Sequence, residues 1–573
     1  MKFPPPRRRS VVSLAIFAAA CACALAWALG GSLAPRAAAQ VFAPFRNFEA
    51  PQVHPLAITP DGTRLLALDT PEGRLSVFNL TPSGLTLAKE IAVGLEPVSV
   101  AARDNNEAWV VNWLSDSVSV VDLSNGNVTR TFDVGDEPTD VLFTKNGALA
   151  FVCVSGLSQV KVFTGSSDAP SQTLNVRGKQ PRALARDASG DRVFVSVFES
   201  GNQTTIVPEA QVRAGGGAPP PSPTLAAGLP LPPSTGLIVK WNGAQWADER
   251  GDGRWSNFIP YTLADVDLVV IDAGGSQAAI AEEIRGVGTN IGNAVYDAAT
   301  DRLLVLNLEA RNQVRFEPNL RGRFISNRLS TIDFKTAAHG VTALDLNPHI
   351  NFSQPAGTDA ERAKSLALPA DIARASDGTL YVAATGSNRV GVFSSSGAVR
   401  ARVAVGQGPT GLALDEARGR LYILDRFENR LSVVDTRTRA EVARVPLGFN
   451  PEPQLLRDGR RFLYDASLSA HGDVSCATCH LDGHRDGLAW DLGDPRGALQ
   501  SSGGFGSPAL HPMKGPMTTQ SLRGILATVG LQSTGRLHWR GDRADLAAFN
   551  PAFTALLGSP RQLTTGEMQA FTE

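Results

Sequence analysis

The chain has 573 residues, a formal net charge of −1 and a hydrophobic content of 43%. This length allows two or more domains, each with its own core, and the balanced charge gives no sign of nucleic acid or another polyanion as a partner. With 55 glycines and 37 prolines, the composition is that of a soluble protein with many turns.

Residues 1–39 have the features of a signal peptide. The segment MKFPPPRRRS is basic, residues 11–31 form an apolar run, and Ala37-Ala38-Ala39 offers a cleavage site before Gln40. The apolar run is also long enough to anchor the chain in a membrane if it is not cleaved. We therefore expect export to the periplasm, the extracellular space or the cell envelope, with membrane attachment only through an uncleaved signal segment.

Residues 41–453 repeat a unit of four short strands. A proline opens each unit, at Pro55, Pro97, Pro138, Pro181, Pro369, Pro409 and Pro451. Four strands in about 40 residues is the period of a β-propeller blade. The sequence predicts seven blades, with six or eight as the alternatives, and we expect residues 41–54 to add a closing strand to the last one.

The long interval between Pro181 and Pro369 contains an insertion. DASGDRVFVSVFES (187–200) and ADVDLVVIDAGG (264–275) are predicted to belong to one blade, and AVYDAATDRLLVLNLEARNQV (294–314) begins the next. Between the first two lies a stretch rich in proline and glycine, near 209–262, which cannot hold a central strand.

These units resemble the YVTN-type seven-bladed propellers of exported bacterial proteins. Phrases such as AWVVNWLSDSVSVVDLSNGNV (108–128) and LYVAATGSNRVGVF (380–393) carry the likeness. The resemblance implies a mainly β fold for this region. It says little about function, because propellers host enzymes and binding scaffolds alike.

The segment Cys476-Ala-Thr-Cys479-His480 fits the motif for covalent attachment of haem c. Two thiols on one helical turn can bond to the two vinyl groups of the porphyrin, and the adjacent histidine then faces the iron. The motif therefore predicts Cys476 and Cys479 as anchors and His480 as the proximal iron ligand. Residues 471–538 also hold five of the eight histidines in the chain.

Two other functions compete for this motif. A zinc site would need further ligands; His484 and His511 are available, but there is no second cysteine pair. A redox dithiol would normally lie in a βαβ unit, which the surrounding sequence does not predict.

The region from 454 to 573 resembles the bacterial di-haem cytochrome c peroxidase and MauG-type superfamily. The likeness lies in LSAHGDVSCATCHLDGHRDG (468–487), GPMTTQSLRG (515–524) and LHWRGDRADLAAF (537–549). It implies a mainly α cytochrome c-type domain that reduces peroxide.

The same resemblance implies roles for two further residues. Trp539 would match a tryptophan that relays electrons, and Glu567 would match an acid that helps to cleave peroxide. The stretch from Thr564 to Glu567 also fits a capping box that opens a helix.

The sixth iron ligand is left open by the sequence. HWRGDR departs from the FWDGRA-like segment of the family and introduces His538, which could be either a sixth ligand or a distal base. Met513 and Met517 are the other candidate sixth ligands.

The sequence stops within a predicted helix. The resembled family continues with a second haem domain, so we expect the haem domain here to be incomplete and a second haem to lie beyond residue 573. The leading hypothesis is an exported haem c oxidoreductase with peroxide as substrate. The alternatives are a mono-haem electron carrier whose propeller docks a redox partner, such as a small cytochrome or cupredoxin-like donor, and a non-enzymatic envelope propeller.

Overall fold

Seven four-stranded antiparallel sheets, blades 1 to 7, are found in the described residues. The computed structural model describes residues 47–165, 167–263, 265–336, 338–500, 509–525 and 537–572. The signal segment predicted at 1–39 lies outside them.

The first three blades follow one another without interruption. Blade 1 consists of β1 (Leu56–Ile58), β2 (Arg64–Asp69), β3 (Arg74–Thr81) and β4 (Gly84–Ala92). Blade 2 consists of β5 (Pro97–Ala102), β6 (Glu107–Asn112), β7 (Ser117–Asp122) and β8 (Asn127–Asp133). Blade 3 consists of β9 (Pro138–Thr144), β10 (Leu149–Val154), β11 (Gln159–Thr164) and β12 (Gln172–Asn175).

The other four blades complete the set. Blade 4 consists of β13 (Lys179–Arg186), β14 (Arg192–Glu199), β18 (Leu268–Asp272) and β19 (Ala279–Ile284). Blade 5 consists of β20 (Thr289–Asp297), β21 (Arg302–Ala310), β22 (Ile325–Asp333) and β23 (Val341–Asp345). Blade 6 consists of β24 (Pro369–Arg374), β25 (Leu380–Ala384), β26 (Arg389–Phe393) and β27 (Val399–Ala404), and blade 7 of β28 (Pro409–Asp415), β29 (Arg420–Asp425), β30 (Arg430–Asp435) and β31 (Ala440–Pro446).

The burial of each strand follows its place in the blade. Strands β2 and β6 are buried almost throughout, because neighbouring blades stack on both of their faces. The outer strands β4 and β8 carry mostly exposed and half-buried residues. Proline is the first residue of β5, β9, β24 and β28, a position where its missing N–H removes no ladder hydrogen bond.

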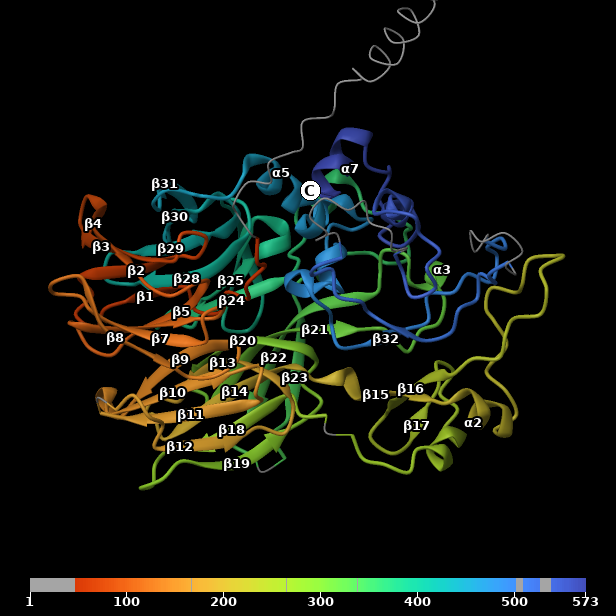
Figure 1. Cartoon of the computed structure of the whole chain (residues 1–573), viewed down its shortest axis with the longest axis horizontal. Coiled ribbons are helices and arrows are strands. Elements are labelled where there is room, and N and C mark those ends of the chain that lie inside the picture. The colour runs from red at the N-terminus through yellow and green to blue at the C-terminus, as the bar shows by residue number, and fades with distance from the viewer. Residues whose placement is uncertain are drawn as a thin grey trace, which may run out of the picture. The chain divides into compact units, whose positions relative to one another are not determined.

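The seven blades form a closed ring. Each innermost strand contacts the next, from β1 through β5, β9, β13, β20 and β24 to β28, and β28 contacts β1 again. Figure 1 shows these strands around a common centre and the outer strands β4, β8, β12 and β19 at the rim. The Arg418 guanidinium of blade 7 seals the junction by donating to the Gly62 and Leu80 carbonyls of blade 1. The predicted propeller is confirmed as a mainly β ring of propeller-like sheets.

The predicted closing strand at 41–54 is wrong for the residues that the structure describes. Blade 7 is complete with β28–β31, and its neighbour blade 1 supplies its own four strands. Val53 instead donates its N–H to the Val98 carbonyl, and the His54 carbonyl accepts from Val100. Residues 53 and 54 therefore lie along β5 of blade 2.

The predicted insertion interrupts blade 4, where β14 pairs directly with β18. It contains β15 (Thr204–Val207), α2 (Glu209–Ala214), β16 (Leu237–Trp241), β17 (Trp246–Ala247) and a 3-10 turn, η3 (Arg254–Phe258). Trp255 is fully buried in a small core of its own with Val212 and Val239.

The segment after blade 7 is not mainly helical in the residues described. Its α-helices are α5 (Gln454–Tyr464), α6 (Ala552–Ala555) and α7 (Thr565–Thr572), with 3-10 turns η6 (Ala466–Leu468), η7 (Cys476–Thr478), η8 (Leu481–Gly483) and η9 (Ala547–Phe549) and the two-residue strands β32 (Ala489–Trp490) and β33 (Met517–Thr518). The described part of this segment is therefore rich in loops, in place of the predicted mainly α cytochrome c-type fold. The physical reason is that repeated glycines and prolines between 483 and 516 disfavour helices.

This C-terminal segment and the ring share one apolar core. Leu308, Leu320 and Phe324 of blade 5 are buried together with Val474 and Trp490 of the segment. Residues Asn47–Glu573 form a single compact unit, so the apolar core continues across the predicted boundary at 453/454.

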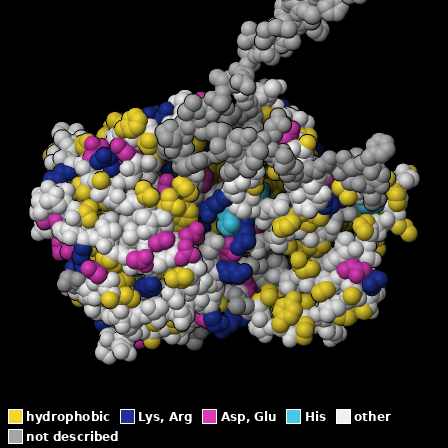
Figure 2. Space-filling view, in the orientation of Figure 1, with side chains coloured by type: hydrophobic (Ala, Val, Ile, Leu, Met, Phe, Trp, Pro, Cys, Tyr) yellow, Lys and Arg dark blue, Asp and Glu magenta, His cyan; other side chains and the backbone are white. Residues whose placement is uncertain are grey.

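Charged contacts also join the segment to the ring. Arg182 of blade 4 pairs with Asp482 at 2.8 Å, and Arg485 pairs with Glu199 at 3.3 Å. Figure 2 shows charged side chains of both signs gathered near the middle of the visible face.

Within the described residues, no helix has the length and apolar character needed to cross a membrane.

Candidate functional site

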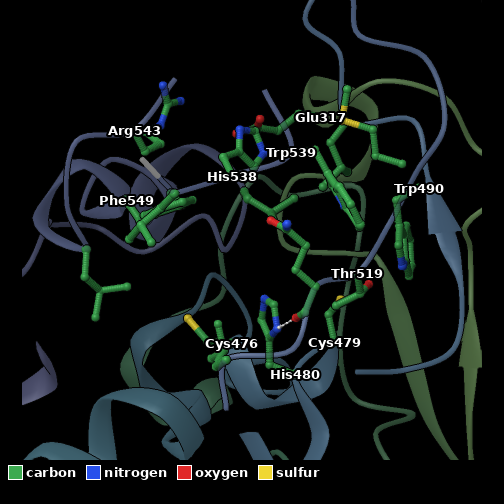
Figure 3. A pocket seen from close by; sticks show the side chains of 18 of the residues that line it. Glu317, Cys476, Cys479, His480, Trp490, Thr519, His538, Trp539, Arg543 and Phe549 are labelled. Atoms are coloured by element: carbon green, nitrogen blue, oxygen red, sulfur yellow. Dashed lines mark hydrogen bonds between the residues drawn. The ribbon is translucent and has the colours of Figure 1, made fainter. Parts of the chain in front are cut away.

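A cavity of about 620 Å³ lies between the C-terminal segment and the loop that joins β21 to β22. Cys476, Cys479 and His480 line one side of it, and Glu317, His538, Trp539 and Arg543 lie on the opposite side in Figure 3. Much of the remaining wall is apolar and includes Phe324, Trp490, Leu492, Phe549, Phe553 and Leu557.

The turn η7 brings the motif residues together. The N–H groups of Cys479 and His480 both donate to the Cys476 carbonyl, at 3.3 and 3.0 Å. The Ser475 N–H donates to Thr478 Oγ1 at 2.9 Å and the Thr478 N–H donates to the Ser475 carbonyl at 3.1 Å, and these two bonds hold the start of the turn. One short turn therefore places both sulfur atoms and the imidazole on the cavity wall.

His480 is oriented by the backbone of a distant loop. Its Nδ1 lies 2.9 Å from the Gln520 carbonyl, which can only accept, so Nδ1 carries the proton (Figure 3). The lone pair of Nε2 is then available to a metal, as in most histidine ligands whose other nitrogen is held by a carbonyl. Burial lowers the pKa of His480, which keeps the imidazole neutral at pH 7.

The two thiols do not have the character of a redox dithiol. Burial raises the pKa of the Cys476 thiol to about 12 and that of Cys479 well above its usual value. Reactive Cys-X-X-Cys pairs depend on lowered thiol pKa values.

The described residues also hold no group of three or more His, Cys, Asp or Glu side chains placed to bind a metal ion. The two histidines available for a zinc site are used elsewhere: His484 Nδ1 bonds Ser521 Oγ at 2.8 Å, and His511 Nε2 bonds the Pro230 carbonyl at 3.0 Å. The described part of the structure therefore gives no support to a zinc site at this motif.

The cavity fits a haem group better than a bare ion. A porphyrin brings four nitrogen ligands of its own, so the chain needs to supply only an axial histidine and two thiols. The volume lies within the range of about 300–1,000 Å³ usual for ligand pockets, and the mostly apolar wall suits the faces of a macrocycle.

Two predicted residues lie on the side opposite His480. His538 has a left-handed backbone, with φ of 73°, and its Nδ1 lies 2.6 Å from Asp542 Oδ1. Trp539 is 53% exposed and donates its indole N–H to the Thr518 carbonyl at 2.5 Å. His538 thus faces the cavity, whereas much of Trp539 faces solvent at its edge.

The two candidate methionines occupy different places. Met517, in β33, lines the cavity, and β33 pairs with β32 beside Trp490. Met513 is buried but is not among the lining residues. The structure therefore brings Met517 and His538, but not Met513, to the cavity as candidate sixth ligands.

Glu567 lies outside the cavity. Its carboxylate accepts from the Thr564 N–H and from both terminal nitrogens of Arg561, at 2.7 and 2.8 Å, in the capping box that opens α7. The Arg561 hydrogen bond is the main cause that lowers its pKa to about 2. A carboxylate held in this way serves the helix and does not face the other site residues.

Sequence reasoning missed Glu317 and Lys514, which also line the cavity. Glu317 lies in a loop of blade 5, and no motif connects this loop to the Cys-X-X-Cys-His segment. Burial raises the pKa of Glu317, against the attraction of Lys514 and Arg543.

The chain matches the family model described as "Lactonase, 7-bladed beta-propeller" over residues 10–211, less than half of its length. No curated protein matches it. Among solved structures it is similar to hydrazine synthase from Kuenenia stuttgartiensis, with 16% identity, a TM-score of 0.48 and coverage of 69% of this chain and 98% of that one.

Two other similar structures are a periplasmic gluconolactonase from Pseudomonas aeruginosa and a virginiamycin B lyase from Staphylococcus aureus. The first has 15% identity, a TM-score of 0.39 and coverage of 62% of this chain and 86% of that one. The second has 11% identity, a TM-score of 0.39 and coverage of 66% and 93%. Because these identities and TM-scores are low, the assignment of the propeller fold depends on the sheet topology. Over residues 10–211 the chain is similar to lactonase-type propellers.

Proposed function

We propose that this protein is an exported haem c oxidoreductase that reduces a small oxidant such as peroxide. The observation that carries the proposal is the joint placement of Cys476, Cys479 and His480 on the wall of one largely apolar cavity. The export prediction rests on residues 1–39, and the likeness of the motif to the di-haem peroxidase superfamily supports the choice of substrate.

Each motif residue has a defined task. Cys476 and Cys479 would form the thioether bonds, and His480 would offer Nε2 to the iron while Gln520 holds Nδ1. The bound haem would supply one-electron chemistry. Reduction of hydrogen peroxide to two water molecules takes up two electrons and two protons, and a donor protein such as a small cytochrome or cupredoxin would supply the electrons.

The opposite wall can handle protons. With Nδ1 donating to Asp542, His538 has Nε2 free to accept a proton from a hydroperoxide in the cavity and to return it to the departing oxygen. Burial lowers the pKa of His538, which keeps it in the accepting form at pH 7. Glu567 plays no part in this proposal, since it is held by Arg561 and Thr564.

A second candidate is a mono-haem electron carrier. The observation in its favour is that Met517 and His538 both line the cavity, and either could close the sixth position. The redox partner would then be a small cytochrome or cupredoxin-like donor that docks near Trp539, whose exposed ring borders the cavity.

Optical and EPR spectra of the ferric protein, matured with haem in a periplasm, test the choice between the two. High-spin iron that consumes hydrogen peroxide, with the rate lowered in His538→Gln, supports the oxidoreductase. Low-spin iron that is indifferent to peroxide contradicts it and favours the electron carrier.

A further inference from the structure

We infer that Glu317, which blade 5 contributes to the cavity wall, acts with Lys514 to set the reduction potential of the group held by Cys476, Cys479 and His480. The inference rests on the proposed haem c function. It makes the propeller a working part of the redox site in addition to its role as a scaffold.

The loop that carries Glu317 is fixed to the C-terminal segment by its backbone. This loop joins β21 to β22 and contains the short helix α3 (Glu317–Leu320). The Phe316 N–H donates to the Asp491 carbonyl at 2.7 Å, and the Glu317 N–H donates to the Gly493 carbonyl at 3.0 Å. These two bonds fix the position of Glu317 relative to residues 491–493, a segment that contributes Leu492 to the cavity wall.

A buried ion pair between two side chains also holds this loop against the C-terminal segment. Arg315 Nε lies 3.1 Å from Asp491 Oδ2, and the two side chains are only 5% and 2% exposed. The Arg315 guanidinium also donates to the Pro219 carbonyl, and its backbone N–H donates to the Glu249 carboxylate. Contacts from the insertion therefore hold the loop from the other side.

The residue before Glu317 has an unusual backbone. Phe316 is fully buried and has φ of 78° and ψ of 132°, a conformation that residues with a Cβ rarely adopt. Such a conformation costs free energy and persists only where the surrounding contacts impose it. Phe316 is held by its hydrogen bond to Asp491 and by the Arg315 guanidinium, which lies 4.5 Å from the ring centre.

Opposite charges meet in this wall. Apart from the motif, the described lining residues that can carry a charge are Glu317, Lys514, His538 and Arg543. Burial lowers the pKa of Lys514, while Glu317 acts in the opposite direction. The charged groups that act on Glu317 are Lys514, Arg543 and Asp494.

The sign of each effect follows from electrostatics. Reduction adds one negative charge to the cavity, so a carboxylate in the wall opposes it and an ammonium group favours it. In a partly desolvated cavity such interactions are much stronger than in water. Net charge and burial are among the levers by which a protein sets a haem potential.

Redox titration of the full chain, matured with haem in a periplasm and studied at pH 8, tests the inference. Glu317→Gln is expected to raise the midpoint potential and Lys514→Gln to lower it. Glu567→Gln removes a carboxylate outside the cavity while keeping the capping box, and is expected to leave the potential unchanged.

Equal potentials in wild type, Glu317→Gln and Lys514→Gln would overturn the inference, as would shifts of both variants in one direction. If Glu317→Gln does not fold, Lys514→Gln alone decides, because an unchanged potential in that variant contradicts the account. Absence of covalent haem in the wild type would instead refute the proposed function, so the two failures are distinguishable.

Discussion

The blades and the C-terminal segment are held together in different ways. A blade is built from strands that follow one another closely in the chain, and β2 pairs with β3 across a turn of four residues. The segment depends on partners far away, since His480 is oriented by Gln520 and Asp491 pairs with Arg315. Local repetition forms the ring, whereas long-range contacts form the site.

This difference explains why the blades and the motif could be predicted from the sequence. The four-strand period predicted the blades, and the pairing of 187–200 with 264–275 across the insertion is confirmed by β14 and β18. The motif at 476–480 was recognisable because its chemistry depends on residues adjacent in the chain.

The rest of the site could not be predicted from local patterns. Glu317 reaches the cavity only because blade 5 and the segment share a core. A capping box was one of the two interpretations of residues 564–567, and the hydrogen bonds between Thr564 and Glu567 support it. Nothing in the sequence distinguished Met517 from Met513, since the choice depends on how β33 pairs with β32.

The largest expected effect is on haem content, which should depend on the motif and not on a neighbouring histidine. His480→Ala removes the proposed axial ligand, and we expect loss of the Soret absorbance of the protein purified from a haem-maturing periplasm. His484→Ala, four residues away and hydrogen-bonded to Ser521, is the matched control and should keep it. Equal haem content in the two variants would contradict the assignment of His480.

The next effect concerns the joint between the ring and the segment. Arg315→Met leaves Asp491 buried without its partner, and we expect unfolding to be easier by about 3–5 kcal/mol. Arg302→Met breaks the solvent-exposed pair with Asp333 and should leave the denaturation midpoint close to that of the wild type. Urea denaturation of both variants measures the contrast, and similar midpoints would show that the buried pair does not hold the two regions together.

A smaller loss of stability is expected from a substitution at the contact that closes the ring. A Cβ added at Gly411 would lie 2.4 Å from Pro55 Cγ, between blade 7 and the start of blade 1. We expect Gly411→Ala to destabilise the protein by about 1–3 kcal/mol through overpacking. Gly340→Ala, where a Cβ meets nothing within 4 Å, is the control in the same denaturation measurement.

A further expected effect is a pH dependence of stability inside the ring. Burial lowers the pKa of His54, but the Asp140 carboxylate, 2.9 Å from Nδ1, outweighs it and raises the pKa to about 9. Because the folded pKa exceeds the ordinary value of 6.5, this contribution is complete below pH 6.5 and is lost as the pH rises through 9. Melting temperatures between pH 6.5 and 9.5 should fall more steeply in the wild type than in His54→Gln, and parallel curves would refute the role of this pair.

The most direct test of the account is the intact mass of the protein purified from a haem-maturing periplasm, measured after denaturation and acid–organic extraction. The account predicts that the chain retains the mass of one haem for the motif at 476–480 and that Cys476→Ser with Cys479→Ser abolishes this increment. A wild-type chain with the bare polypeptide mass, or with haem that the solvent extracts, would contradict it.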